Sequence, residues 1–371
     1  MKKQTIMVLS CHTPSLFWFR IDMMKSFLAR GYRVVAVGQE PEAEWMERFA
    51  EMGIRYRQMF AERNGTNPLR DLKTLKSIQK VIDEEKPDKI FCYQAKTIIY
   101  GSLAAHSRKI SEIYPLIAGL GSVFRGSGLK NKVIRLILKT EYRAALKYAQ
   151  GVMFQNPDDM GCFTGEKIVP EEKCRIINGS GVDTEKFVPT EYPETPAFLM
   201  IARLLRDKGV GEYLDACRIV KKKHPAVRCM LVGTFDTNPS AIQPEELQKY
   251  LDDGTVEYFG EQSDVRPYLE QTTVFVLPSY HEGTPKTVLE AMASGRAVIT
   301  TNAPGCRETV TDGLNGLLVP VKDTEALAAA MERLTDDLPL CRKMGEEGRR
   351  IAVNKYDVKQ VNSGIAEIMK L

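Results

Sequence analysis

The stretch that decides the fold runs from residue 274 to residue 295 and reads Val274-Phe-Val-Leu-Pro-Ser-Tyr-His-Glu-Gly-Thr-Pro-Lys-Thr-Val-Leu-Glu-Ala-Met-Ala-Ser-Gly295. Its first four residues are apolar, which is typical of a strand buried on both faces. A polar loop with a glycine follows, and from residue 286 the apolar residues recur at helical spacing. Strand, loop and helix in this order build a parallel sheet covered by helices, and ligands bind where such strands end.

The same alternation of buried strands and helices repeats along both halves of the chain. Apolar runs that alternate with helical patterns lie at 6–9, 34–37, 89–92, 116–118 and 152–154, and again at 198–202, 229–232, 274–277 and 297–300, and a further short strand is expected at 175–177. Residues 324–371 instead read as successive helices. Since 371 residues exceed what one hydrophobic core supports, we predict an α/β protein of two Rossmann-like domains facing across a cleft.

Composition places the boundary between the two domains. A segment with several Gly and Pro residues, 178–196, separates the two alternating series and has the character of a linker. We therefore place the N-terminal domain at 1–180 and the C-terminal domain at 190–354. The last helix, 355–371, is expected to complete the N-terminal domain.

Composition and charge exclude several classes of protein. The apolar fraction of 43% and charged fraction of 27% are ordinary for a soluble enzyme, and no apolar run approaches the ~20 residues that span a bilayer. The eight cysteines include no Cys-x-x-Cys pair, and the aspartate pairs at 158–159 and 252–253 have no His or Cys at ligand spacing, so we expect neither disulfides nor a metal site. Without a visible export signal, and with a net charge of only +4, we expect a cytoplasmic protein that does not bind nucleic acid.

Positive charge is concentrated in residues 129–148. This segment holds six Lys or Arg residues and one acid, and Lys132, Arg135 and Lys139 recur at helical spacing beside apolar residues. Two interpretations remain open. The helix has an ordinary solvated face, or it meets anionic lipid or a lipid-linked phosphate, in which case the membrane contact is peripheral.

The loop and the helix start of the quoted stretch carry the chemistry. Thr284 is predicted to cap the helix and Pro285 to occupy its first turn, so that backbone N–H groups and the positive end of the helix dipole face a ligand above the sheet. A diphosphate fits such a place. Glu282 and Glu290 add two carboxylates able to accept hydrogen bonds from sugar hydroxyls, although one loop acid and one surface acid is the plainer interpretation.

Glu282 and Glu290 form a Glu-x7-Glu pattern that resembles the retaining GT-B glycosyltransferases of the family-four type. The segment Ile201-Ala-Arg-Leu-Leu-Arg-Asp-Lys-Gly209 is similar to the phosphate-binding segment of that family. Further matches to its linker and second domain, in order and spacing, lie at 178–187, 232–234, 259–264, 304–308 and 315–320. Each motif is weak alone, and their common order makes the resemblance specific.

The resemblance implies roles for individual residues. Arg203 and Lys208 neutralise the diphosphate of a nucleotide-sugar donor held by the C-terminal domain, Glu282 contacts the sugar, and Glu290 contacts the ribose. The catalytic residues expected on this basis are Glu282, Arg203 and Lys208, and the donor-binding residues are Gly233, Glu261, Glu282, Gly283, Thr284, Pro285, Lys286 and Glu290. The N-terminal domain binds the acceptor, and its loop 10–15 closes over the donor. Protein cations replace a bound metal ion in such enzymes, so no cofactor is expected.

One position departs from the family. Its members place a histidine near the donor sugar, just before a small-residue helix of the first domain, and Ala95 stands there in this chain. His12 and Gln94 are candidate replacements, between which the sequence does not decide. A retaining transfer in which the acceptor attacks from the leaving-group face needs no enzyme nucleophile, so the departure does not contradict the resemblance.

Within the family, the chain resembles bacterial enzymes that extend polyprenyl-diphosphate-linked sugars, N-acetylgalactosaminyl and hexosyl transferases among them. This likeness rests on residues 119–124, 201–203, 208–210, 276–280 and 305–306. It implies a UDP-sugar donor, a lipid-linked saccharide acceptor, a place at the inner face of the cell membrane, and contact of Arg20 with the acceptor diphosphate. Arg20 fits an ordinary surface position equally well. A soluble acceptor is the alternative, and a UDP-sugar 2-epimerase is a further one.

Overall fold

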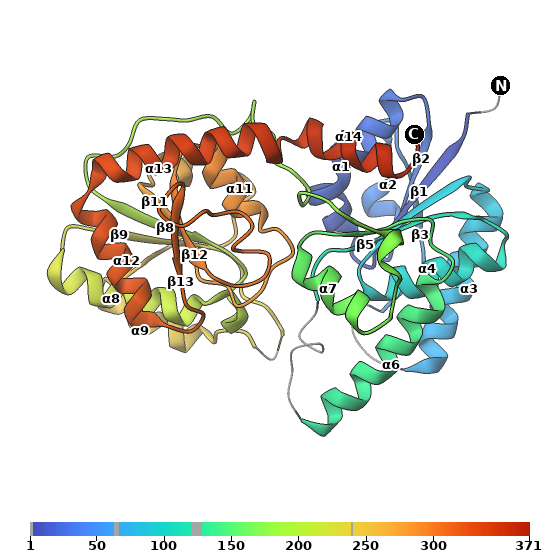
Figure 1. The fold of residues 1–371 in the computed structure, drawn as a ribbon, viewed down its shortest axis with the longest axis horizontal. Coiled ribbons are helices and arrows are strands. Elements are labelled where there is room, and N and C mark those ends of the chain that lie inside the picture. Colours follow the sequence, from blue (N-terminus) through green and yellow to red (C-terminus); the bar gives the residue numbers. More distant parts are fainter. Residues whose placement is uncertain (1–2, 63–66, 121–127, 239) are drawn as a thin grey trace. The chain divides into compact units, whose positions relative to one another are not determined.

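The computed structural model describes residues 3–62, 67–120, 128–238 and 240–371, without the side chains of residues 129 and 130. The chain divides into two compact units, Met1–Ser180 with Val361–Leu371, and Gly181–Gln360. Each unit is a parallel sheet with helices on its faces (Figure 1). Part of the segment 119–124, on which the family likeness partly rests, lies outside the described residues.

The first unit contains a seven-stranded sheet in the order β3-β2-β1-β4-β5-β6-β7. Its strands are β1 (Thr5–Leu9), β2 (Arg33–Gly38), β3 (Arg55–Gln58), β4 (Lys89–Tyr93), β5 (Glu112–Ile117), β6 (Val152–Phe154) and β7 (Cys174–Ile176). Its helices are α1 (Thr13–Ala29), α2 (Glu42–Ala50), α3 (Pro68–Glu85), α4 (Ala95–Ser107), α6 (Leu129–Leu146) and α7 (Pro157–Gly165), with a 3-10 turn, η1, at Glu171–Lys173.

Both faces of the first sheet are buried. Met7 and Leu9 belong to one hydrophobic core and Ile6 and Val8 to another, because successive side chains of a strand point to opposite faces. This explains why the strand sequences read as continuous apolar runs. The C-terminal helix α14 (Val358–Ile368) adds Ile365 to the second core, so the end of the chain packs on the first unit (Figure 1).

The second unit contains a six-stranded sheet in the order β10-β9-β8-β11-β12-β13. Its strands are β8 (Ala197–Ile201), β9 (Arg228–Val232), β10 (Glu257–Tyr258), β11 (Val274–Leu277), β12 (Ala297–Thr301) and β13 (Gly316–Val319). Its helices are α8 (Val210–Lys223), α9 (Pro244–Asp252), α10 (Arg266–Glu270), α11 (Lys286–Ala293), α12 (Thr324–Asp336) and α13 (Leu338–Ile351), with a 3-10 turn, η2, at Arg206–Lys208 and a π-helical turn, η3, at Ala352–Tyr356.

The predicted fold class is confirmed, and the predicted series lacked three strands. These are β3, β10 and β13, which form edges of the two sheets and pair with one neighbour each. In β3 and β10 the strand is only partly covered, so its sequence carries no continuous apolar run: one of the four residues of β3 is buried, and both residues of β10 are half-buried. This reason does not apply to β13, which is apolar and mostly buried.

Each sheet has a point at which the strand order reverses. In the first unit this switch point lies between β1 and β4, and in the second between β8 and β11. Loops that leave two such neighbouring strands diverge, which opens a crevice at the carboxyl edge of the sheet. In the first unit Gln94 bridges the switch point, because its Oε1 accepts hydrogen bonds from the Cys11 N–H (2.8 Å) and the Ser10 hydroxyl (3.0 Å).

The structure also bears on disulfides and on membrane-spanning helices. None of the eight cysteines, all of which lie in described parts of the chain, forms a disulfide. Across the described residues, the helices are too short or too polar for any of them to cross a membrane.

Candidate active site

The candidate site lies at the switch point of the second sheet. The segment that leaves β8 carries Arg203 and Lys208, and the loop that leaves β11 carries Glu282. Strands β8 and β11 are hydrogen-bonded neighbours, so residues far apart in sequence start from adjacent positions at one edge of the sheet.

Backbone contacts fasten these two segments to each other. The carbonyl oxygen of Asp207 accepts hydrogen bonds from the Tyr280 N–H (2.9 Å) and from the Ser279 hydroxyl (3.1 Å). Gly209 follows with a left-handed φ of 74°, and a Cβ at this position would overlap the carbonyl group of Pro278. The close approach of the two loops therefore requires a glycine at 209.

Lys208 and Glu282 form an ion pair. The Lys208 Nζ lies 2.5 Å from the Glu282 Oε1, and the two side chains are only 23% and 12% exposed. Two of the three residues predicted to be catalytic are therefore in direct contact. The third, Arg203, is on the same segment and pairs with Asp236 at 2.7 Å, a residue that the sequence did not indicate because the pairing depends on the path of the loop after β9.

A second glycine supports the loop that carries Glu282. The Glu282 N–H donates to the Pro304 carbonyl oxygen at 2.9 Å. At Gly305, which has a φ of 81°, an added Cβ would overlap the carbonyl group of Glu282. The family motif at 304–308 thus contributes backbone that holds the Glu282 loop.

Helix α11 begins at Lys286, and its cap differs from the prediction. Pro285 occupies the cap position with extended backbone, and no side chain caps the helix in this described stretch. The expectation that Thr284 caps and that Pro285 lies in the first turn is therefore wrong by one residue. The reason is that the Pro285 carbonyl already accepts from the N–H groups of Val288 (3.1 Å) and Leu289 (3.3 Å), which makes Pro285 the residue that starts the helix.

Glu290 lies on α11 in an environment unlike that of Glu282. Its side chain is 11% exposed, and the Lys286 Nζ, one helical turn earlier, lies 3.9 Å from its Oε1. Burial raises the pKa of Glu290 from its ordinary value of 4.5 to about 7, although the charges of Lys286 and Lys186 lower it.

The residues expected near the nucleotide base follow β9 and β10. The Gly233 N–H donates to the Gly260 carbonyl oxygen (2.8 Å), and the Gly233 carbonyl accepts from the Tyr258 hydroxyl (2.8 Å). Glu261, next to Gly260, is exposed. The structure thus brings Gly233 and the loop of Glu261 together at the ends of adjacent strands.

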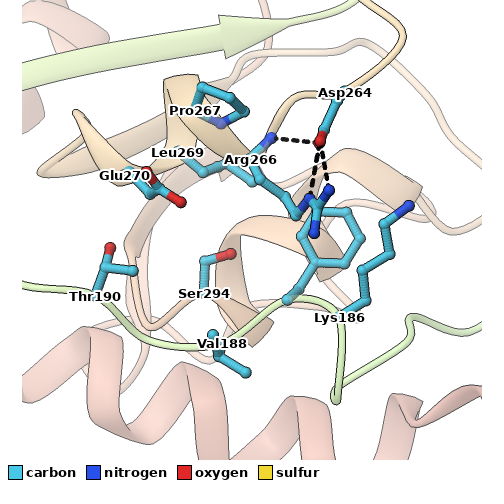
Figure 2. Close-up of a pocket in the computed structure, with 10 residues that line it drawn as sticks. Lys186, Val188, Thr190, Asp264, Arg266, Pro267, Leu269, Glu270 and Ser294 are labelled. Atoms are coloured by element: carbon cyan, nitrogen blue, oxygen red, sulfur yellow. Dashed lines mark hydrogen bonds and ion pairs between the residues drawn. The ribbon is translucent and has the colours of Figure 1, made fainter.

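A pocket of about 240 Å³ lies elsewhere in the second unit and includes none of the predicted site residues. Figure 2 shows Arg266 beside Asp264 in its wall, with Lys186 at the right of the view. The Arg266 Nη2 lies 2.5 Å from the Asp264 Oδ2, and this partner lowers the pKa of Asp264 to about 2. Of the four charged residues that line the pocket, Asp264 and Arg266 are paired, and the charge of Lys186 lowers the pKa of Glu290.

In the first unit, Arg20 is buried. It is 3% exposed, and its guanidinium lies 5.1 Å from the ring centroid of Tyr93 and 5.9 Å from that of Phe91. Burial lowers its pKa to about 10. The alternative of an ordinary surface residue is wrong, and contact with an acceptor diphosphate stays a prediction that requires this side chain to be uncovered.

Helix α6 carries both charge and exposed apolar surface. Lys132 is exposed and Arg135 half-buried, while the Lys139 Nζ lies 2.7 Å from a carboxylate oxygen of Glu166. Three large apolar side chains, at positions 133, 136 and 137, are 52%, 64% and 49% exposed. The helix therefore presents an amphipathic surface rather than an evenly polar one.

Within the described ranges, no three His, Cys, Asp or Glu side chains come together in a way that could hold a metal ion.

Comparison with known proteins identifies the family. Residues 182–351 match the family described as glycosyl transferases group 1, and residues 6–156 match glycosyl transferase 4-like. An N,N'-diacetylbacillosaminyl-diphospho-undecaprenol alpha-1,3-N-acetylgalactosaminyltransferase of Campylobacter jejuni is 30% identical over 358 residues, covering 92% of each chain. A UDP-Gal:alpha-D-GlcNAc-diphosphoundecaprenol alpha-1,3-galactosyltransferase of Escherichia coli is 26% identical, covering 78% of this chain and 77% of its own.

Solved structures agree on the fold. The sucrose-phosphate synthase of Thermosynechococcus elongatus has a TM-score of 0.81 at 19% identity and covers 99% of this chain and 98% of its own. The chain therefore belongs to the glycosyltransferases of the group 1 and 4-like families, which confirms the resemblance inferred from its motifs, and its fold is GT-B.

Alanine substitutions at two glycines test whether close packing at Gly305 holds the Glu282 loop. Gly305→Ala should lower the free energy of unfolding by several kcal/mol, since it adds a clash with the Glu282 carbonyl to the roughly 1 kcal/mol cost of alanine at positive φ. Gly313→Ala is the matched control: Gly313 has a φ of 74° and open space where the added Cβ would lie, so this substitution should show only the cost of alanine at positive φ. Thermal unfolding compares the two, and equal losses would contradict the close packing at Gly305.

The raised pKa of Glu290 predicts a pH dependence of stability. The Glu290 carboxyl group ionises near pH 4.5 in the unfolded chain and near pH 7 in the folded chain. The folded state therefore loses stability as the pH rises from 4.5 to 7. Glu290→Gln should therefore be more stable than the wild type at pH 8 by on the order of 1–3 kcal/mol and about equally stable near pH 4.5. Thermal unfolding at several pH values measures this, with the exposed Glu325→Gln as control; parallel profiles for wild type and Glu290→Gln would refute the assignment.

Proposed function

We propose that this chain transfers a hexose or N-acetylhexosamine from a UDP-sugar to a saccharide carried on polyprenyl diphosphate, with retention at the anomeric carbon, in surface-glycan assembly. The observation that carries the proposal is the Lys208–Glu282 ion pair at the switch point, with Arg203 on the same segment. Two cations beside a carboxylate fit a donor in which a diphosphate is joined to a sugar.

The proposed reaction needs no nucleophile from the protein. The bond between the anomeric carbon and the diphosphate oxygen breaks, an acceptor hydroxyl oxygen bonds to that carbon on the same face, and its proton passes to the departing phosphate oxygen. Arg203 and Lys208 stabilise the negative charge that builds on the diphosphate, and Glu282 orients the sugar hydroxyls. Since these cations supply the positive charge, we expect no metal cofactor. Glu290 holds the ribose.

The proposed acceptor class rests on the relatives. The two relatives described above are named for acceptors in which a sugar is joined to undecaprenol through a diphosphate, and one is named for UDP-galactose as donor. The same classes of donor and acceptor are our proposal for this chain. Such an acceptor is held in a membrane, so we propose that the protein acts at the inner face of the cell membrane from the cytoplasm.

Helix α6 supports a peripheral contact with anionic lipid. Since a helix has 3.6 residues per turn, Leu136 lies one turn after Lys132, and Ile137 one turn after Val133. Basic and exposed apolar side chains therefore run beside each other along the helix. This arrangement suits a helix that lies in the interface of a membrane, where the apolar side chains enter and the cations meet the headgroups.

Donor and acceptor can be tested together. Calorimetric titration with UDP, GDP and a panel of UDP-sugars should show selective binding of UDP and one UDP-sugar. Mass spectrometry with short-chain polyprenyl-diphosphate sugars should then show the mass of one added sugar. Binding without a lipid product would shift the acceptor to a soluble saccharide, and hydrolysis or isomerisation of the UDP-sugar alone would favour an epimerase. If the protein bound none of these nucleotides, the proposed function would be wrong.

In the same titration, Arg203→Ala and Lys208→Ala should each weaken UDP binding by about ten- to hundredfold, because each removes a charge-assisted contact with the diphosphate. Arg218→Ala on α8, which removes an exposed arginine paired with Asp253, is the matched control and should leave binding unchanged. If both variants bound UDP as tightly as the wild type, the proposal that Arg203 and Lys208 bind the diphosphate would be contradicted.

The proposed membrane contact predicts that removing the basic residues of α6 weakens binding to anionic vesicles. Replacing Lys132, Arg135 and Lys139 together with alanine should lower binding to phosphatidylglycerol vesicles by on the order of a hundredfold, at about 1 kcal/mol for each basic residue near the surface. Activity on a short-chain acceptor in detergent should persist. Replacing Lys221, Lys222 and Lys223 of α8 removes the same charge elsewhere and controls for net charge. Equal vesicle binding by the two triple variants would leave α6 as a solvated helix.

A further inference from the structure

The loop that leaves β9 is built against the segment that carries Arg203. The Leu204 N–H donates to the Thr234 carbonyl (3.0 Å) and the Leu204 carbonyl accepts from the Ile242 N–H (2.9 Å). The Arg206 N–H donates to the Ser240 carbonyl at 2.8 Å. Backbone hydrogen bonds on both sides of the loop thus fix its position relative to the Arg203 segment.

Asp236 stands in this loop with both carboxylate oxygens engaged. Its Oδ1 accepts from the Asn238 N–H at 2.9 Å, which closes a turn of the loop. Its Oδ2 accepts from the Arg203 Nη1 at 2.7 Å. Asn238 continues the series, because its own Oδ1 accepts from the Ser240 N–H at 2.9 Å. The carboxylate that holds Arg203 is therefore itself held by the backbone.

Arg203 gains orientation from this arrangement. Its side chain is 45% exposed, and a long side chain in solvent samples many rotamers whose loss opposes ligand binding. A guanidinium has five N–H donors in a rigid plane, of which the contact with Asp236 uses one. The hydrogen bond from Nη1 to Asp236 fixes the plane of the Arg203 guanidinium. The remaining N–H groups are therefore already oriented when an anion binds.

We propose that Asp236 is a positioning residue of the donor site, which holds the Arg203 guanidinium in the orientation that binds the donor diphosphate. The inference rests on the proposed function, since it requires that Arg203 bind that diphosphate. If Asp236 instead competed with the diphosphate for Arg203, replacing Asp236 would raise the affinity for UDP, whereas a positioning role predicts that it lowers that affinity.

Asp236→Asn separates these two relations. The amide oxygen still accepts from the Asn238 N–H and preserves the turn, while the attraction to the guanidinium is lost. Affinity for UDP, measured by calorimetric titration, should fall by roughly three- to tenfold, the range of an exposed ion pair plus the ordering of one arginine. In an Arg203→Ala background the same substitution should change the affinity no further, because Asp236 acts through Arg203.

The chain offers a closely matched control. Asp253 also closes a turn with one oxygen, which accepts from the Thr255 N–H at 3.0 Å, and pairs with an arginine through the other, at 2.7 Å from the Arg218 Nη2. Asp253→Asn removes the same kind of ion pair between α8 and the residue that follows α9, and should leave UDP affinity unchanged. If Asp236→Asn lowers the thermal midpoint much more than Asp253→Asn, Asp236→Ser replaces it, since a serine oxygen also closes such a turn.

The outcomes separate this inference from the proposed function. Unchanged or tighter UDP binding by Asp236→Asn, or an equal loss in the Arg203→Ala background, overturns the positioning role while UDP binding by the wild type upholds the donor site. Absence of UDP binding by the wild type overturns the donor site itself.

Discussion

The site depends on one constraint of backbone geometry, namely that β8 and β11 end side by side while the chain leaves them toward opposite parts of the sheet. The segments that carry Arg203, Lys208 and Glu282 are attached to these ends. The Asp207 carbonyl, which accepts from both Tyr280 and Ser279, sets the distance between the two loops. Gly209 and Gly305 allow the backbones to approach because any Cβ there would overlap a carbonyl group.

The charges of the site are balanced in the described structure. Lys208 is paired with Glu282 and Arg203 with Asp236. Glu290, in contrast, is buried, and burial raises its pKa to about 7 although the Lys286 Nζ, 3.9 Å from its Oε1, lowers it. The two members of the Glu-x7-Glu pattern therefore lie in different environments, because one is in a loop and pairs with a lysine and the other is on the covered face of a helix.

Two basic segments of the first unit illustrate how packing separates similar sequences. Arg20 and the arginines and lysines of α6 all stand beside apolar residues in the sequence. Helix α1 places Arg20 against Phe91 and Tyr93 of the sheet, whereas α6 leaves Leu136 and its apolar neighbours exposed. The same combination of residue types thus yields a buried cation in one helix and an amphipathic surface in the other.

The sequence by itself determined the class of fold, the central strands and the order of the motifs, because buried parallel strands read as apolar runs and because Arg203, Lys208 and Glu282 stand at strand ends. Only the tertiary structure decided the rest. Several features depend on what lies beside each residue in space: the edge strands β3 and β10, the helix start at Lys286, the burial of Arg20 and Glu290, and the pairing of Arg203 with Asp236. A pattern along the chain records burial that repeats with a strand or helix period, whereas a contact between two loops leaves no period to read.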